Sequence, residues 1–167
     1  MQAKRGRALL KGCDKMSKKK LVFNVLAPVI GGSIVGYLAN KNARLQYDKL
    51  ETPSFAPPGK VFPIVWPTLY TMMGYAHYRV AQKPATKEAS EWYAAQLTLN
   101  YIWSFLFFKF NLRGTALIEM VFFLATIIMT TYEFYQHDTI AGTLMIPYIA
   151  WVSFALTLNF ETWRLNR

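Results

Sequence analysis

GTLMIPYIAWVSFALTLNFETW, residues 142–163, is an apolar stretch in which Glu161 is the one charged residue. An α-helix rises about 1.5 Å per residue and needs roughly 20 mainly apolar residues to cross about 30 Å of hydrocarbon. The stretch has this length and this composition. It therefore predicts a transmembrane helix.

Four other segments share this length and apolar character, at residues 21–40, 61–81, 91–110 and 115–135. Lipid offers no hydrogen-bond partners to the backbone, so only helices and closed barrels cross a membrane. A strand barrel would alternate apolar and polar residues with a period of two, and these segments do not. We therefore expect an all-α integral membrane protein, a bundle of five transmembrane helices.

Composition supports a membrane protein, because 53% of the residues are hydrophobic and only 17% are charged, against about 25% in a typical soluble domain. The net charge of +10 is concentrated before the first span, at Lys4, Arg5, Arg7, Lys11, Lys15, Lys18, Lys19 and Lys20. A nucleic-acid-binding protein would spread such charge over a folded face. We expect instead a basic N-terminal tail (1–20) that meets anionic lipid, then a single five-helix domain (21–167). The predicted partner is the lipid bilayer, with no nucleic acid.

The excess of basic residues in the tail favours an N-terminus on the inside of the membrane. Met16, followed by Ser17 and three lysines, is a second plausible start. Residues 1–15 are then an extension, and the charge preference disappears.

Residues that could hold a metal or perform conventional catalysis are scarce. Cys13 is the single cysteine, and the two histidines are His77 and His137, so we expect no metal site. Neither an acid–base pair nor a nucleophilic triad is visible, which disfavours an ordinary hydrolase or transferase. For His77 we expect a hydrogen-bonded structural role.

The connection at residues 41–60 is the longest between spans, and long ordered loops in compact domains are usually functional. Its Pro53, Pro57 and Pro58 each fix their own φ and bias the preceding residue towards extended geometry. We expect a stiff lid over the mouth of a pocket.

Motifs in all five spans and in this loop resemble one membrane-protein family. They are LAPVIGG (26–32), YDKLETPSFAPPG (47–59), VWPTLYTMMGYAHY (65–78), LTLNYIWSFLFF (97–108), ALIEM (116–120) and IPYIAWVSFALTLNFETWRLN (146–166). The chain resembles the translocator protein family, also called tryptophan-rich sensory proteins or peripheral-type benzodiazepine receptors. Two departures are Phe55, where the family commonly has Trp, and Glu119, where Asp is typical.

The resemblance implies a receptor for tetrapyrroles, such as protoporphyrin IX and haem, and for synthetic aromatic ligands. It implies a cell membrane if the protein is bacterial and the mitochondrial outer membrane if it is eukaryotic. No cofactor is obligatory, and porphyrin or haem would be a ligand. The first alternative is light-dependent porphyrin breakdown against Trp66 and Trp151, and the second is transport of sterols or other small molecules.

Polar and aromatic stripes on the spans suggest where a ligand would bind. In the fifth span Pro147, Trp151, Ala155, Asn159 and Trp163 recur every four residues, and polar groups in a span are expected to face the bundle interior. Comparable stripes on the other spans lie at similar depth beneath the loop. The predicted ligand-binding residues are Phe55, Trp66, Tyr70, Asn100, Trp103, Glu119, Trp151 and Ala155.

Gly32 and Gly36 have the spacing of a GxxxG helix-packing motif. This motif indicates close packing within the bundle or, alternatively, between the protomers of a homodimer.

Overall fold

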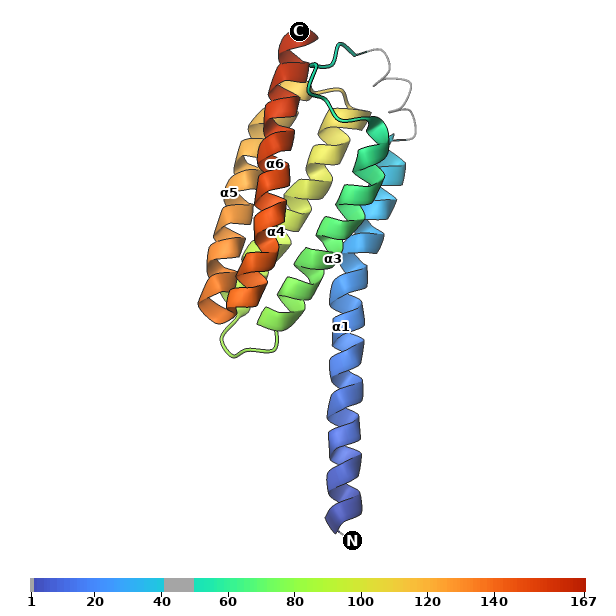
Figure 1. The fold of residues 1–167 in the computed structure, drawn as a ribbon, viewed down its shortest axis with the longest axis vertical. Helices are drawn as coiled ribbons and strands as arrows, with labels where there is room; N and C mark the ends of the chain where they lie inside the picture. Colours follow the sequence, from blue (N-terminus) through green and yellow to red (C-terminus); the bar gives the residue numbers. More distant parts are fainter. Residues whose placement is uncertain (1, 41–49) are drawn as a thin grey trace.

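The computed structural model describes residues 2–40 and 50–167, with side chains for residues 18–39 and 50–167. Residues 41–49 of the predicted loop thus lie outside the described part. Within it, the five α-helices are α1 Gln2–Asn40, α3 Phe62–Val80, α4 Lys87–Ser104, α5 Arg113–His137 and α6 Thr139–Leu165 (Figure 1). A 3₁₀ turn, η1 Gly59–Val61, leads into α3, and a π-helical turn, η2 Phe105–Lys109, extends α4. The predicted bundle of five helices is confirmed.

The helices match the predicted spans to within a few residues at most ends. Among the described residues, three helical segments are long and apolar enough to cross a membrane by themselves: Lys18–Ala39, α5 and α6. The basic tail is helical from Gln2 and continuous with the first span, so α1 extends beyond the other helices (Figure 1).

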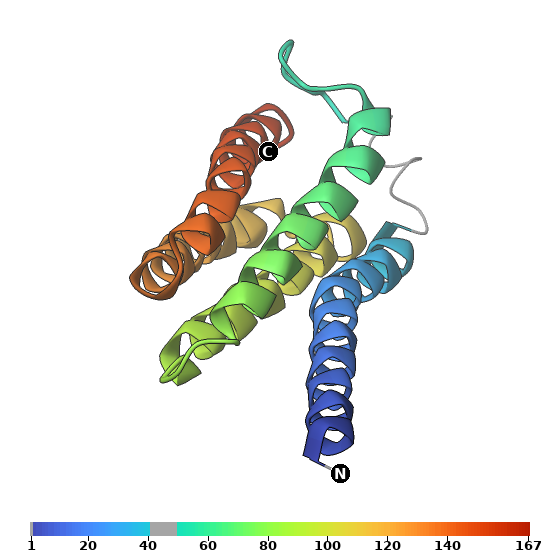
Figure 2. The ribbon, with the colours of Figure 1, turned by 60° about the horizontal axis from the view of Figure 1, so that its bottom comes forward.

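Neighbouring helices in the chain are mostly neighbours in space. Helix α5 packs between α4 and α6, whereas α3 packs against α6 and α1. Figure 2 shows α1 on the outer side of α3. We call the end of the bundle that holds the C-terminus the upper end and the end with the α3–α4 connection the lower end.

The tightest turn in the described residues joins α5 to α6 through Asp138 alone. The carboxylate of Asp138 caps α6 by accepting from the backbone N–H of Ala141 at 2.9 Å. The guanidinium of Arg79 donates to the same carboxylate through Nε at 3.1 Å and Nη2 at 2.9 Å. Asp138 therefore ties the lower end of α3 to the α5–α6 corner.

Helix α1 approaches α3 closely because glycines lie at the contact. A side chain at Gly32 would meet the ring of Tyr70, and one at Gly74 would meet the backbone of Asn24. Gly32 thus packs within the chain, which is the first of the two alternatives that its motif allowed. The homodimer stays a prediction.

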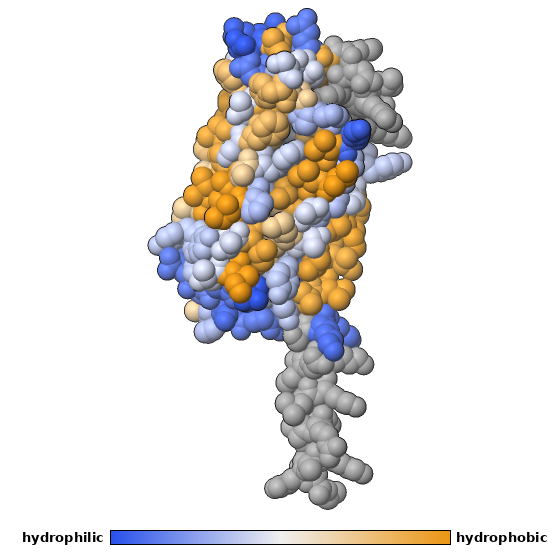
Figure 3. All heavy atoms as spheres, in the orientation of Figure 1, coloured by the Kyte–Doolittle hydropathy of each residue, from blue (hydrophilic) through white to orange (hydrophobic). Residues whose placement is uncertain are grey.

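The surface of the bundle is apolar over its middle part and polar at its two ends (Figure 3). Large apolar side chains are exposed on the helices, among them Phe23 at 72%, Ile64 at 69% and Phe122 at 63%. Such exposure is unfavourable in water, whereas lipid tails are as apolar as these side chains. The surface is that of a multi-pass integral membrane protein.

Candidate ligand-binding site

Four of the predicted site residues meet between α3 and α4. The ring of Trp66 lies 5.6 Å from that of Tyr70 and 6.3 Å from that of Trp103, between centroids. The hydroxyl of Tyr70 donates to Asn100 Oδ1 at 2.6 Å. Tyr70, Asn100 and Trp103 are buried, and Trp66 is half-buried. The two aromatic stripes therefore face each other inside the bundle, as the sequence predicted.

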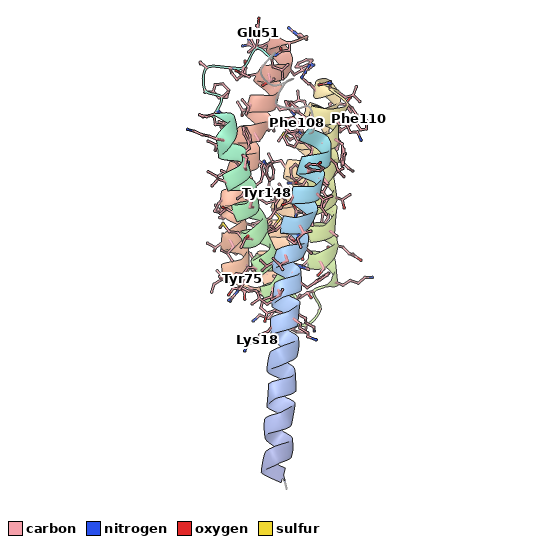
Figure 4. The ribbon with its side chains drawn as sticks, turned by 90° about the vertical axis from the view of Figure 1, so that its right-hand side faces the viewer. Lys18, Glu51, Tyr75, Phe108, Phe110 and Tyr148 are labelled. Carbon is pink, nitrogen blue, oxygen red and sulfur yellow. The ribbon has the colours of Figure 1, made fainter. Side chains whose placement is uncertain are left out.

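A buried chain of hydrogen bonds continues from this cluster to α6. Asn100 Nδ2 donates to the Tyr148 hydroxyl at 2.9 Å, and that hydroxyl donates to Gln96 Oε1 at 2.9 Å. Tyr148 lies among the helices in Figure 4 and is 1% exposed. Sequence reasoning missed Tyr148 and Gln96, although Gln96 lies one turn before Asn100 and shares its helix face.

Trp151 belongs to a second aromatic group that joins α6 to the start of α3. Its ring centroid lies 5.9 Å from that of Phe62 and 5.7 Å from that of Phe154. Phe62 is one helical turn before Trp66, so the two groups lie side by side on α3. Ala155, one turn after Trp151, is buried at 6% exposure.

The loop reaches this second group through Phe55. The Phe55 ring packs edge-on against Phe154 at 6.2 Å between centroids, although 46% of Phe55 remains exposed. The backbone of Glu51 is hydrogen-bonded to the side chain of Asn166, at the end of α6. Residues 51–58 thus run from the end of α6 to the start of α3 (Figures 1 and 4).

Several polar atoms of the predicted residues are buried without a hydrogen-bond partner in the described part of the chain. They are both carboxylate oxygens of Glu119 and the indole Nε1 atoms of Trp103 and Trp151. Most buried polar groups in proteins are paired, so an orphaned donor or acceptor calls for an explanation. Because no hydrogen bond within the described residues ties the Glu119 carboxylate to the aromatic groups, its place in one site with them stays a prediction.

The predicted stripe on the fifth span is only partly inside the bundle. Asn159 is buried, but Pro147 is exposed and Trp163 is half-buried. A step of four residues turns about 40° beyond a full helical turn, so the stripe drifts off the buried face. The buried face instead follows Met145, Tyr148, Val152, Ala155 and Asn159.

His77 has the structural role that was predicted for it. Its Nδ1 lies 2.6 Å from Asn24 Oδ1 and its Nε2 lies 3.1 Å from Ser90 Oγ. Its ring stacks on Tyr93 at 4.2 Å between centroids. The histidine thereby joins α1, α3 and α4 near the lower end, away from the aromatic groups.

Two hollows of the surface lie outside the predicted site. One, of about 790 Å³, follows α1 from Lys18 to Ile34. The other, of about 300 Å³, lies at the upper end, between the start of α5 and the end of α6. None of the predicted residues lines either hollow.

Known proteins match this chain over most of its length. The sequence profile of the TspO/MBR family matches residues 24–164. The chain is 42% identical to the tryptophan-rich sensory protein of Cereibacter sphaeroides over 120 residues, which cover 72% of this chain and 76% of that protein. It is 35% identical to the human translocator protein over 146 residues, covering 84% and 86%. It is 29% identical to the tryptophan-rich protein TspO of Archaeoglobus fulgidus over 153 residues, covering 90% and 99%.

Proposed function

The chain belongs to the TspO/MBR family, and on that premise we propose that it is a membrane receptor for tetrapyrroles such as protoporphyrin IX and haem. The ligand would bind between α3, α4 and α6, beneath residues 51–58. Membership supports the receptor class, and the relatives are named for sensing and translocation. The ligand itself is our proposal.

The observation that carries the proposal is the convergence of aromatic rings with unpaired polar groups. A porphyrin is a large, flat and mostly apolar ring with polar substituents at its edge. Trp66 and Trp151 are half-buried, so each keeps part of its ring available for offset stacking on such a ligand. The unpaired indole N–H groups of Trp103 and Trp151 could donate to its polar edge.

The packing of the free protein sets a condition on binding. The centroids of Trp66 and Trp103 are 6.3 Å apart, so the macrocycle cannot enter between these rings without a side-chain movement. Side-chain rearrangement on binding is common. We therefore propose that the ligand stacks on the open sides of Trp66 and Trp151, next to Phe62.

The test is a titration of protoporphyrin IX into the protein in lipid nanodiscs, followed by the fluorescence anisotropy of the porphyrin. Two stacking contacts of about 0.5–1.5 kcal/mol each predict that Trp66→Ala/Trp151→Ala lowers the affinity by about five- to 150-fold. Trp92→Ala is the matched control, because Trp92 is also half-buried but lies near the lower end of α4. Full affinity in the double variant would exclude the proposed site.

A further inference from the structure

The contact between Asn166 and Glu51 holds residues 51–58, which we call the strap. Asn166 Oδ1 accepts from the backbone N–H of Glu51 at 3.1 Å, and Asn166 Nδ2 donates to the Glu51 carbonyl at 2.8 Å. One amide side chain thus pairs with both backbone groups of one residue, as a neighbouring β-strand would. Figure 4 shows Glu51 beside the end of α6.

The orientation of the Asn166 amide is fixed by a third hydrogen bond. Its Nδ2 also donates to the carbonyl of Thr162 at 2.7 Å, one turn earlier in α6. Both hydrogens of the amide and its oxygen therefore have partners, and no alternative orientation satisfies all three. Asn166 follows directly on the last residue of α6 and is also the attachment point of the strap.

The strap itself is stiff, so its movement depends on its ends. Pro53, Pro57 and Pro58 restrict its backbone, and a turn is closed by the backbone N–H of Ala56, which donates to the Pro53 carbonyl at 2.9 Å. One end continues through η1 into α3. The other end is held by Asn166, and between them Phe55 rests on Phe154.

We propose that Asn166 is a latch that keeps the strap closed over the seam between α3 and α6 and so sets the rate at which a ligand enters and leaves. This inference rests on the proposed function, because the rate concerns the same site. The strap passes from the upper end of α6 to that of α3 (Figure 1), and its Phe55 contacts Phe154, which contacts Trp151, which in turn contacts Phe62. Opening the strap removes the Phe55 contact and exposes this aromatic group.

The two hydrogen bonds to Glu51 set the size of the effect. A neutral hydrogen bond contributes about 0.5–1.5 kcal/mol, so both together shift the balance between closed and open strap by about five- to 150-fold. Asn166→Asp has nearly the same shape and keeps an acceptor for the backbone N–H of Glu51, but it loses the donor to the Glu51 and Thr162 carbonyls, and its negative charge would face both of them. The ratio of open to closed strap should therefore rise by at least the lower figure, because the lost donor is replaced by a carboxylate that faces two carbonyl oxygens.

The first measurement needs no ligand. In nanodiscs, hydrogen exchange of the peptide that contains Glu51 should accelerate about five-fold or more in Asn166→Asp. The control is Asn111→Asp, the same chemical change at an exposed residue of the same end. Asn166→Gln is a second variant for the case that the aspartate disturbs α6, because its amide is displaced by one methylene. Unchanged exchange in both Asn166 variants overturns the latch.

The second measurement is stopped-flow mixing of protoporphyrin IX with the same proteins. The association and dissociation rates should both rise about five-fold or more in Asn166→Asp and stay unchanged in Asn111→Asp. A looser strap with unchanged rates overturns the inference that the strap controls access. If the wild type binds no protoporphyrin, the proposed function fails, and the exchange result still decides whether Asn166 holds the strap.

Discussion

Replacing Tyr148 by Phe removes a single hydroxyl and should destabilise the bundle by more than most Tyr→Phe changes. That hydroxyl accepts from Asn100 Nδ2 and donates to Gln96 Oε1, both at 2.9 Å. Gln96, Asn100 and Tyr148 are at most 1% exposed, so water cannot replace the lost partner. Hydrogen bonds between membrane helices average about 0.6 kcal/mol and reach about 1.7. Losing two should therefore lower the free energy of unfolding by about 1–3 kcal/mol.

The assay is unfolding in mixed micelles, followed by tryptophan fluorescence while the fraction of denaturing detergent increases. Tyr132→Phe is the matched control, because Tyr132 is 57% exposed. This substitution should change the free energy of unfolding by less than about 0.5 kcal/mol. A second variant tests the cause. Tyr148→Phe/Gln96→Leu replaces both partners of one bond, so it should lose less stability than the sum of the single changes.

Equal midpoints for Tyr148→Phe and Tyr132→Phe would refute this reasoning. The buried hydrogen bonds of Tyr148 would then contribute no more to stability than an exposed hydroxyl does. Additive losses in the double variant would refute the argument from unpaired groups alone, since a lost partner would then carry no separate penalty.

Two further predictions concern packing and pH. Gly74→Ala should lower the free energy of unfolding by about 1–3 kcal/mol, because the added methyl meets the backbone of Asn24, whereas Gly59→Ala has open space around it and should be neutral in the same unfolding assay. Equal effects of Gly74→Ala and Gly59→Ala would show that α1 moves to accommodate the added methyl at no cost in stability. The Arg79 guanidinium, which donates to Asp138, lowers the pKa of that carboxyl below its ordinary value of 3.8. The ion pair thus stabilises the fold fully above this value, and its contribution is lost as the pH falls through the lowered pKa. Asp138→Asn should therefore be less stable than the wild type at neutral pH, with a difference that disappears in acid; a gap in thermal midpoint that persists at low pH would contradict this.

Much of the fold could be predicted from the sequence because a membrane imposes a simple rule. A span must be apolar over a fixed length, and the residues from 142 to 163 satisfy it without any knowledge of their neighbours. The same rule placed α3, which begins at Phe62, within a residue of its predicted start. The rule did not predict that the basic tail of α1 is helical, because it applies only to residues that cross the lipid.

The candidate site was harder to predict, since its contacts join distant parts of the chain. Stripes that each helix shows by itself predicted that Trp66 and Trp103 face the bundle interior, and the structure brings their rings within 6.3 Å. Asn166 and Glu51 are 115 residues apart, and no local pattern connects them. Tyr148 was missed because a four-residue repeat was followed along α6, although the buried face of a helix advances by 3.6 residues.

The π-helical turn η2 could not be predicted from the spacing of apolar residues, for another reason. It lies in the last turn of an apolar span, where Trp103 stacks on Phe107 and the ring of Phe108 packs edge-on against both. The sequence shows a run of aromatic residues there, which suits an α-helix equally well. The choice between the two helices depends on how these rings pack against neighbours, and such turns are frequent at functional sites.

The two ends of α3 are held by chemically different contacts. At the lower end Arg79 and Asp138 form an ion pair, which salt and acid weaken. At the upper end the strap that continues into α3 is held by the uncharged amide of Asn166. Salt and moderate acid do not weaken this contact. A change in ionic conditions at the lower end would therefore weaken the ion pair there and leave the contact of the strap at the upper end unchanged.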